Sequence, residues 1–121
     1  MSTFEWRPED DALVDLLMRT GMRKNTARAL AHLKRSGEST SLDIEAATSL
    51  RQPEVSIAMQ DLRSRGWVEK RDMKRKGKGR PIHAYSLALT FSEIIDVIEA
   101  EEQERVEEIL GNIATLRNLS G

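Results

Sequence analysis

The hydrophobic positions of this chain follow helical spacing in five segments and alternating spacing in two. The helical spacing is clearest at residues 53–65, where apolar side chains recur at i, i+3, i+4 and i+7 as Val55, Ala58, Met59 and Leu62. This spacing places the four side chains on one face of a helix. Pro53 suits the first helical position, because its fixed φ fits a helix and its missing N–H is not needed there. Gly66 predicts the end of the helix.

Three shorter helices are expected before residue 53. The first opens with acidic residues at 9–11, which suit the positive end of a helix dipole, and ends at Gly21. The second begins at Asn25 or Thr26 and ends at Gly37; a loop follows, and Ser41 is expected to cap the third. His32 is expected to be a partly exposed helix residue. The side chains expected to face the core are Leu13, Val14, Leu16, Leu17, Ala27, Leu30, Ala31, Leu33, Leu42, Ile44, Ala47 and Leu50.

Two segments with alternating polarity predict an antiparallel hairpin. The first strand begins at Trp67 and continues to about Lys74, and the return strand covers Ile82 to Leu87. Between them, the stretch KRKGKGRP cannot be a helix and predicts the tip of the hairpin. Both faces of the return strand carry apolar side chains, so the pattern leaves open which face is inward.

A change of character at Phe91 predicts one long helix, capped by Ser92 and running to about Asn118. Its apolar stripe continues for about seven turns, which is longer than a small domain can cover. A second copy of the helix would bury this stripe; the alternative is that the helix folds back onto the first helix. We therefore expect a domain at 1–90 and a dimerisation helix at 91–121. The expected dimerisation residues are Ile95, Ile98, Val106, Ile109, Ile113 and Leu116.

Composition narrows the class of protein. A chain of 121 residues with 39% hydrophobic and 32% charged residues is expected to be one soluble domain with an appended helix. No apolar run approaches the ~18 residues that a membrane helix needs, and the acidic amino-terminal segment is unlike a signal peptide. The chain contains no cysteine, which excludes disulfides and thiolate metal sites. We expect a cytoplasmic protein that uses no metal or cofactor.

Charge is strongly segregated, although the net charge is only −1. Residues 63–80 contain nine basic and two acidic side chains, whereas residues 81–121 contain two basic and eight acidic ones. A polyanion such as DNA is attracted by a local excess of positive charge and not by the net charge of the whole chain. The basic segment follows a helix with a polar face, and this arrangement is typical of nucleic-acid binding.

The run VSIAMQDLRSRGWVEKR resembles the segment of MarR-like and TrmB-like regulators that contains the recognition helix and the start of the wing. The run KGKGRPIHAYSL resembles the archaeal form of that wing. The resemblance implies a mainly α fold with a small β-wing, in which a winged helix-turn-helix of four helices and two strands precedes a long dimerisation helix. It also implies a homodimeric transcriptional regulator that binds double-stranded DNA.

For the recognition helix, residues 53–65, the resemblance and the polar face of the helix select the same side chains. A glutamine pairs with an adenine edge, and Ile57 suits a thymine methyl group. Glu54 can accept a hydrogen bond from cytosine, although it would repel phosphates. The alternative is a merely solvated helix face. The residues expected to face the major groove are Gln52, Pro53, Glu54, Ser56, Ile57, Gln60 and Arg63.

In the wing, residues 70–81, glycines allow the backbone to approach DNA closely. The run from Lys78 to Pro81 is similar to the core of the AT-hook, so Arg80 is expected in a narrow minor groove. The alternatives are contact with phosphate alone and a solvated loop. The cations expected to contact DNA from the wing are Lys74, Arg75, Lys76, Lys78 and Arg80.

No catalytic site is expected. His32 and His83 lie in different elements, and the sequence contains neither a P-loop nor an HExxH pattern. Two other functions remain open at this point. One is a winged-helix interaction module of a transcription or assembly complex, with the acidic last helix docking a partner. The other is an architectural DNA-binding protein with little sequence preference. The sequence identifies no small-molecule effector.

Overall fold

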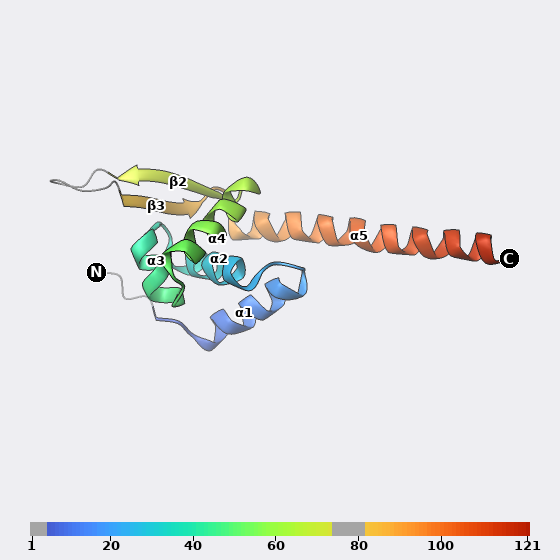
Figure 1. Cartoon of the computed structure of the whole chain (residues 1–121), viewed down its shortest axis with the longest axis horizontal. Helices are drawn as coiled ribbons and strands as arrows, with labels where there is room; N and C mark the ends of the chain where they lie inside the picture. The colour runs from blue at the N-terminus through green and yellow to red at the C-terminus, as the bar shows by residue number, and fades with distance from the viewer. Residues whose placement is uncertain (1–4, 74–81) are drawn as a thin grey trace. The chain divides into compact units, whose positions relative to one another are not determined.

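The computed structural model describes residues 5–73 and 82–121. It forms two compact units, Met1–Thr90 and Phe91–Gly121. The structure is mainly helical with a small sheet, as predicted. The first unit contains α1 (Pro8–Arg19), α2 (Lys24–Ser36), β1 (Ser39–Thr40), α3 (Ser41–Thr48), α4 (Gln52–Ser64), β2 (Val68–Met73) and β3 (Ile82–Leu87), and the second contains α5 (Phe91–Ser120) (Figure 1).

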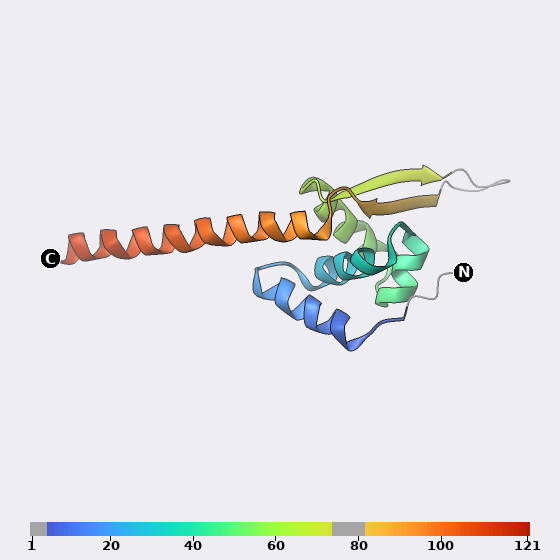
Figure 2. The same ribbon diagram turned by 180° about the vertical axis from the view of Figure 1, so that it is seen from behind.

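Helix α2 is the centre of the first unit, because it packs against both α1 and α4. Figures 1 and 2 show this arrangement from opposite sides. The predicted burial of two side chains is wrong: Leu16 in α1 is 61% exposed and Leu42 in α3 is 62% exposed. Each apolar stripe is wider than the face that the neighbouring elements cover, so a residue at its edge stays in solvent. The largest apolar side chains of the core are those of Leu30, Leu33, Ile44, Val55, Met59, Leu62 and Trp67.

His32 also differs from its prediction, because its side chain is buried with only 1% of its surface exposed. Its Nε2 atom lies 3.0 Å from the hydroxyl of Ser39 and 3.2 Å from the hydroxyl of Ser36. Burial lowers the pKa of His32, because the imidazolium form would lose its hydration. The histidine therefore joins α2 to the segment that follows it.

Asp10 is a second buried polar residue of the first unit. Its carboxylate accepts hydrogen bonds from the backbone N–H of Arg7 at 2.8 Å and from the guanidinium of Arg35 at 2.7 Å. Burial by itself raises the pKa of Asp10, but the hydrogen bonds from Arg35 and Arg7 hold that pKa below its ordinary value. One bond caps α1 and the other ties α1 to α2.

The segment between α2 and α3 is not only a loop. Ser39 and Thr40 form β1, which pairs antiparallel with β3 and gives the sheet the order β1-β3-β2. A strand of two residues is too short for alternation to reveal. Thr40, and not Ser41, caps α3, because its hydroxyl accepts the backbone N–H of Asp43 at 3.1 Å.

Strands β2 and β3 form the predicted hairpin, with Val68 opposite Leu87. The return strand has the predicted bounds. β2 covers Val68–Met73, and its predicted end at about Lys74 lies outside the described residues. Ala84 and Tyr85 point to opposite faces of β3, and both are buried. Each face of this strand is therefore partly covered.

Helix α5 is 30 residues long and ends at Ser120, two residues beyond the predicted end. No helix in the described part of the chain is long and apolar enough to cross a membrane. The large apolar side chains that α5 exposes are Ile95, Val106, Ile109, Leu110, Ile113, Leu116 and Leu119.

Candidate nucleic-acid interface

Helix α4 has one buried and one exposed face. The apolar stripe that predicted the helix is buried, and the side chains on the other face are exposed to solvent. Ile57 is 59% exposed in the middle of this polar face. A side chain of this kind is available for apolar contact with a partner. The exposed residues on this face are Gln52, Pro53, Ser56, Ile57, Gln60 and Arg63.

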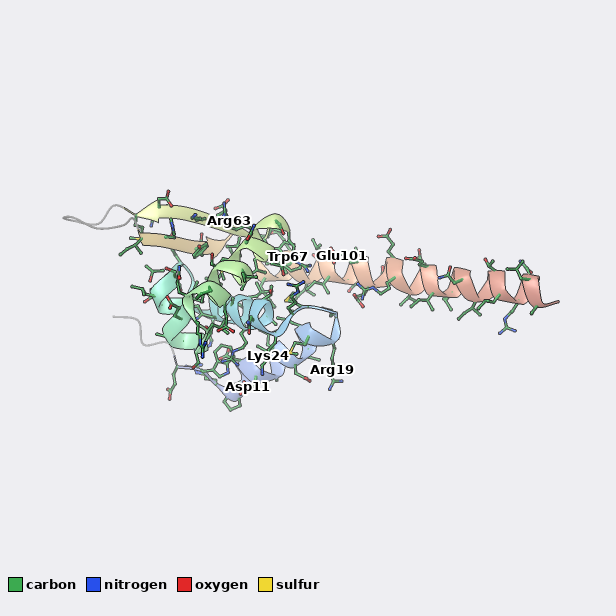
Figure 3. The ribbon with its side chains drawn as sticks, viewed as in Figure 1. Asp11, Arg19, Lys24, Arg63, Trp67 and Glu101 are labelled. Atoms are coloured by element: carbon green, nitrogen blue, oxygen red, sulfur yellow. The ribbon has the colours of Figure 1, made fainter. Side chains whose placement is uncertain are left out.

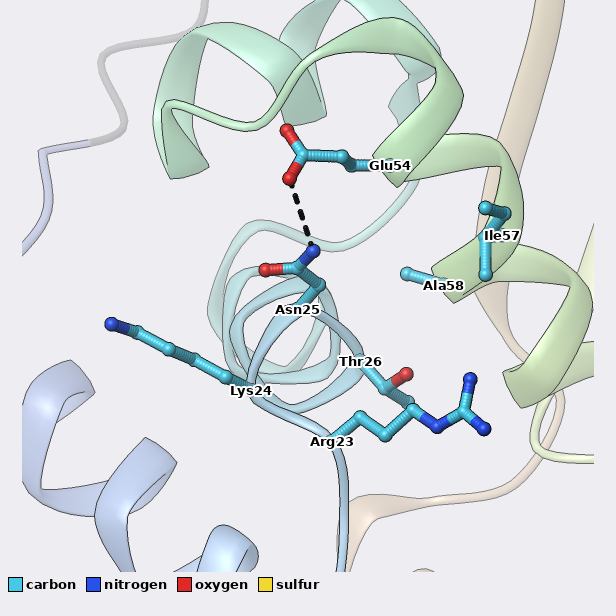
Figure 4. A pocket seen from close by; sticks show the side chains of 7 residues that line it. All are labelled: Arg23, Lys24, Asn25, Thr26, Glu54, Ile57 and Ala58. Carbon is cyan, nitrogen blue, oxygen red and sulfur yellow. Dashed lines mark hydrogen bonds between the residues drawn. The ribbon is translucent and has the colours of Figure 1, made fainter.

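Glu54 has a different environment from the other predicted base-contacting residues. It is half-buried, and its two carboxylate oxygens both accept hydrogen bonds. One accepts the backbone N–H of Arg51 at 2.9 Å, and the other accepts the amide of Asn25 at 3.2 Å (Figure 4). The carboxylate therefore caps the amino-terminal end of α4 and fixes it to the start of α2.

The start of α2 extends the surface beside α4. Arg23, Lys24 and Asn25 line a hollow of about 240 Å³ together with Glu54 and Ile57. In Figure 4 the side chain of Arg23 extends on the same side as Ile57, whereas Lys24 extends to the other side. Arg23 also lines the neighbouring hollow that contains Gln60. Sequence analysis missed Arg23 and Lys24, because nothing in the sequence indicates which helix start lies beside α4.

Several arginines of the first unit are neutralised by their own chain. Arg19 pairs with Asp15 at 3.1 Å, and Arg35 pairs with Asp10 at 2.7 Å. Four cations on or beside α4 differ from these, since none has a carboxylate within 4.0 Å in residues 5–73 and 82–121. They are therefore available to pair with an external anion. These four are Arg23, Lys24, Arg51 and Arg63.

Arg63 connects the face of α4 with the hairpin. It lies in the last turn of α4 (Figure 3). It lines one hollow with Lys70 and Arg71 of β2. Helix and hairpin thus contribute cations to one hollow, which Glu38 and Glu69 also line. Cations on both elements are expected of a duplex-binding winged helix.

The half of the hairpin nearer its tip contains an internal ion pair and a cross-strand side-chain contact. Arg71 donates to Glu38 at 2.6 Å, and this hydrogen bond lowers the pKa of the glutamate. His83 Nδ1 lies 2.7 Å from the carboxylate of Asp72 on the opposite strand. Arg71 is therefore paired with a carboxylate of its own chain. Lys70, the other described cation of β2, is also exposed to solvent. The predicted wing contacts Lys74, Arg75, Lys76, Lys78 and Arg80 lie outside the described residues.

Arg28 supports the turn between α3 and α4. Its guanidinium donates to the carbonyl oxygen of Thr48 at 2.7 Å and lies 4.6 Å from the ring centroid of Trp6. The indole N–H of Trp6 donates in turn to Asp11 at 2.8 Å. Thr48 ends α3, and Ser49 after it has a left-handed backbone with φ of 59°. Arg28 therefore holds the turn from α2, a role that its outward position in the helical pattern did not indicate.

These features define a winged helix-turn-helix: α3 and α4 form the helix pair, and β2 and β3 form the wing. The sequence signature of the MarR family matches residues 15–78, which is more than half of the chain. The chain belongs to the MarR family. The solved structures that share its fold include proteins described as transcription regulators. No curated protein sequence matches the chain.

Solved structures share this fold at low sequence identity. TrmBL2, described as an archaeal chromatin protein with a novel mode of DNA binding, is 19% identical with a TM-score of 0.69; the match covers 90% of this chain but only 40% of TrmBL2. A possible transcriptional regulator from Methanosarcina mazei Go1 is 12% identical with a TM-score of 0.67, covering 93% and 91% of the two chains. The Multiple Antibiotic Resistance Repressor, MarR, is 18% identical with a TM-score of 0.51, covering 92% and 83%.

Proposed function

We propose that this chain is a sequence-specific DNA-binding transcriptional regulator that acts as a homodimer. The observation that carries the proposal is the exposed polar face of α4 together with Arg23, Lys24, Arg51 and Arg63, which have no carboxylate within ion-pairing distance in the described residues. Unneutralised cations beside an exposed helix are what a duplex requires, because phosphate contacts supply most of the sequence-independent affinity.

The side chains of this face divide into two roles. Gln60 bonds an adenine edge and Ile57 packs on a thymine methyl group, so these two residues read sequence. Arg23, Lys24 and Arg51 bind phosphates and fix the register of α4 in the major groove. Glu54 holds the start of the helix in place, which is consistent with its two internal hydrogen bonds.

The wing and α5 complete the proposal. The wing cations, with Arg80 foremost, contact the minor groove or the backbone beside the site of α4. Two copies pair through α5 and read a two-fold site. The centres of the half-sites then lie about one helical turn apart, or a multiple of it. The residues proposed to join the copies are Ile95, Ile98, Val106, Ile109, Ile113 and Leu116.

Selection of bound sequences from random DNA, followed by fluorescence-anisotropy titration, tests the proposal. A specific regulator should prefer its selected site by at least about 10³ over unrelated DNA. Arg63→Ala should weaken binding, whereas Arg19→Ala, which changes an arginine in the last turn of α1, should not. Tight binding without preference would indicate an architectural protein, and absence of binding would indicate a protein-interaction module.

A further inference from the structure

The charges of α5 divide the helix into two unlike halves. Residues 91–108 contain eight acidic side chains and one arginine, whereas residues 109–121 contain Arg117 and no acidic side chain. Arg105 pairs with Glu102 of its own helix at 3.1 Å. The first half is therefore strongly anionic, and the second half is slightly cationic.

Two pairs of apolar residues near the ends of α5 are placed symmetrically about the middle of the helix. Ile95 and Ile98 are three residues apart, as are Ile113 and Leu116. The two pairs lie at equal distances from the point between residues 105 and 106. If a second copy runs in the opposite direction, Ile95 faces Leu116 and Ile98 faces Ile113 in both halves of the pair at once.

We infer that two copies of this chain associate through an antiparallel pair of α5 helices. In a parallel pair, the two acidic halves would lie side by side with their axes about 10 Å apart, close to the Debye length of about 8 Å in physiological salt, so their carboxylates would still repel one another in part. In an antiparallel pair, the acidic half of each copy lies beside the half that carries Arg117. Exposed apolar side chains on both halves give the pair its contact surface. This inference rests on the homodimer proposed above and adds its orientation.

Spin labels on the two halves of α5 test this orientation directly, because the chain has no cysteine of its own. Asp96→Cys and Asn118→Cys place single labels on the side of the helix away from the apolar stripe. In a parallel pair, both distances between copies equal the width of the pair, about 20–25 Å. In an antiparallel pair, the two axial separations sum to about 66 Å whatever the register, so the larger distance is at least about 35 Å.

Light scattering on the same samples separates the possible failures. A monomer at tens of micromolar would overturn the homodimer and the orientation together. A dimer with two equal short distances would overturn the orientation and leave the homodimeric regulator intact. Arg117→Glu should weaken the antiparallel dimer by about fivefold or more, whereas Arg19→Glu in α1 should leave the dimer unchanged. Equal effects of the two variants would contradict the inference.

Discussion

Helices α4 and α5 contain the same apolar spacing in opposite environments. In α4 the residues at i, i+3, i+4 and i+7 are Val55, Ala58, Met59 and Leu62, and all are at most 1% exposed. In α5 the residues with the same spacing are Val106, Ile109, Leu110 and Ile113, and all are at least 41% exposed. The pattern predicts a helix with an apolar face in both cases, but it does not say which chain covers that face.

The polar faces of the two helices differ in the sign of their charge. Beside the polar face of α4 lie the cations Arg23, Arg51 and Arg63, whereas the first half of α5 carries eight carboxylates. A helix whose apolar face is already buried within its own unit can offer its polar face to DNA. The apolar face of α5 is exposed, so it can pack against another protein surface. The carboxylates of α5 repel a polyanion such as DNA.

The largest effect should come from shortening one apolar side chain in each of the two stripes. Leu62→Ala should lower the free energy of unfolding by about 3 kcal/mol, because it leaves a cavity in the core. Ile113→Ala should leave the stability of the first unit unchanged and weaken association of the copies. Urea unfolding followed by tryptophan fluorescence measures the first effect, since both tryptophans lie in the first unit. Equal destabilisation by the two variants would contradict the comparison.

A smaller effect, on discrimination between DNA sites, should distinguish the polar face of α4 from that of α5. Gln60→Ala should remove about 2 kcal/mol of discrimination between the selected site and a site altered at one base pair. Asn118→Ala, which shortens an exposed amide on α5, should leave that discrimination intact. Competition titrations with the two duplexes measure both variants. If Asn118→Ala relaxes specificity as much as Gln60→Ala, the face of α4 does not read the bases.

Acid should destabilise the first unit and not α5. The pKa of His32 is lowered by burial from the ordinary 6.5, so below pH 6.5 the unfolded chain binds a proton that the folded chain does not. Stability therefore falls as the pH drops from 6.5. Below about 3.8 it falls further, because Asp10 also has a lowered pKa when folded.

Urea midpoints measured by tryptophan fluorescence between pH 7 and pH 4.5 test this dependence. His32→Gln should flatten the pH dependence of the urea midpoint. The helical signal of α5 should not decline in this range, because α5 contains no histidine. A midpoint that stays constant in the natural chain would show that His32 binds its proton equally well in the folded state.

The smallest effect should come from one carboxylate in each helix. Glu54→Gln should cost about 0.5 kcal/mol of stability, because a neutral amide interacts less well with the positive end of the α4 dipole. It should also raise the affinity for DNA slightly at low salt, since one negative charge leaves the interface. Glu108→Gln in the middle of α5 should cost nothing. Thermal unfolding and anisotropy at 50 mM salt measure the two effects.

Sequence analysis predicted the elements whose signals are local. The helices, the hairpin and the exposed face of α4 follow from spacing, turn residues and caps within a few positions. β1 was missed because its only signal is pairing with a strand more than forty residues later. The roles of Arg23 and Arg28 were missed for a similar reason, since each depends on which part of the fold lies beside it. Glu54 was correctly placed on the helix, but its hydrogen bond to Asn25 depends on tertiary contact.

The contact between Trp6 and Arg28 bears on how shortened versions of the protein should be interpreted. The residues before α1 lie on an arginine that holds the carbonyl oxygen of Thr48, from which the chain turns towards α4. Removing those residues would leave this arginine without its aromatic neighbour. A truncated protein that binds DNA poorly would then report a loosened turn, even if the deleted segment never touches the duplex.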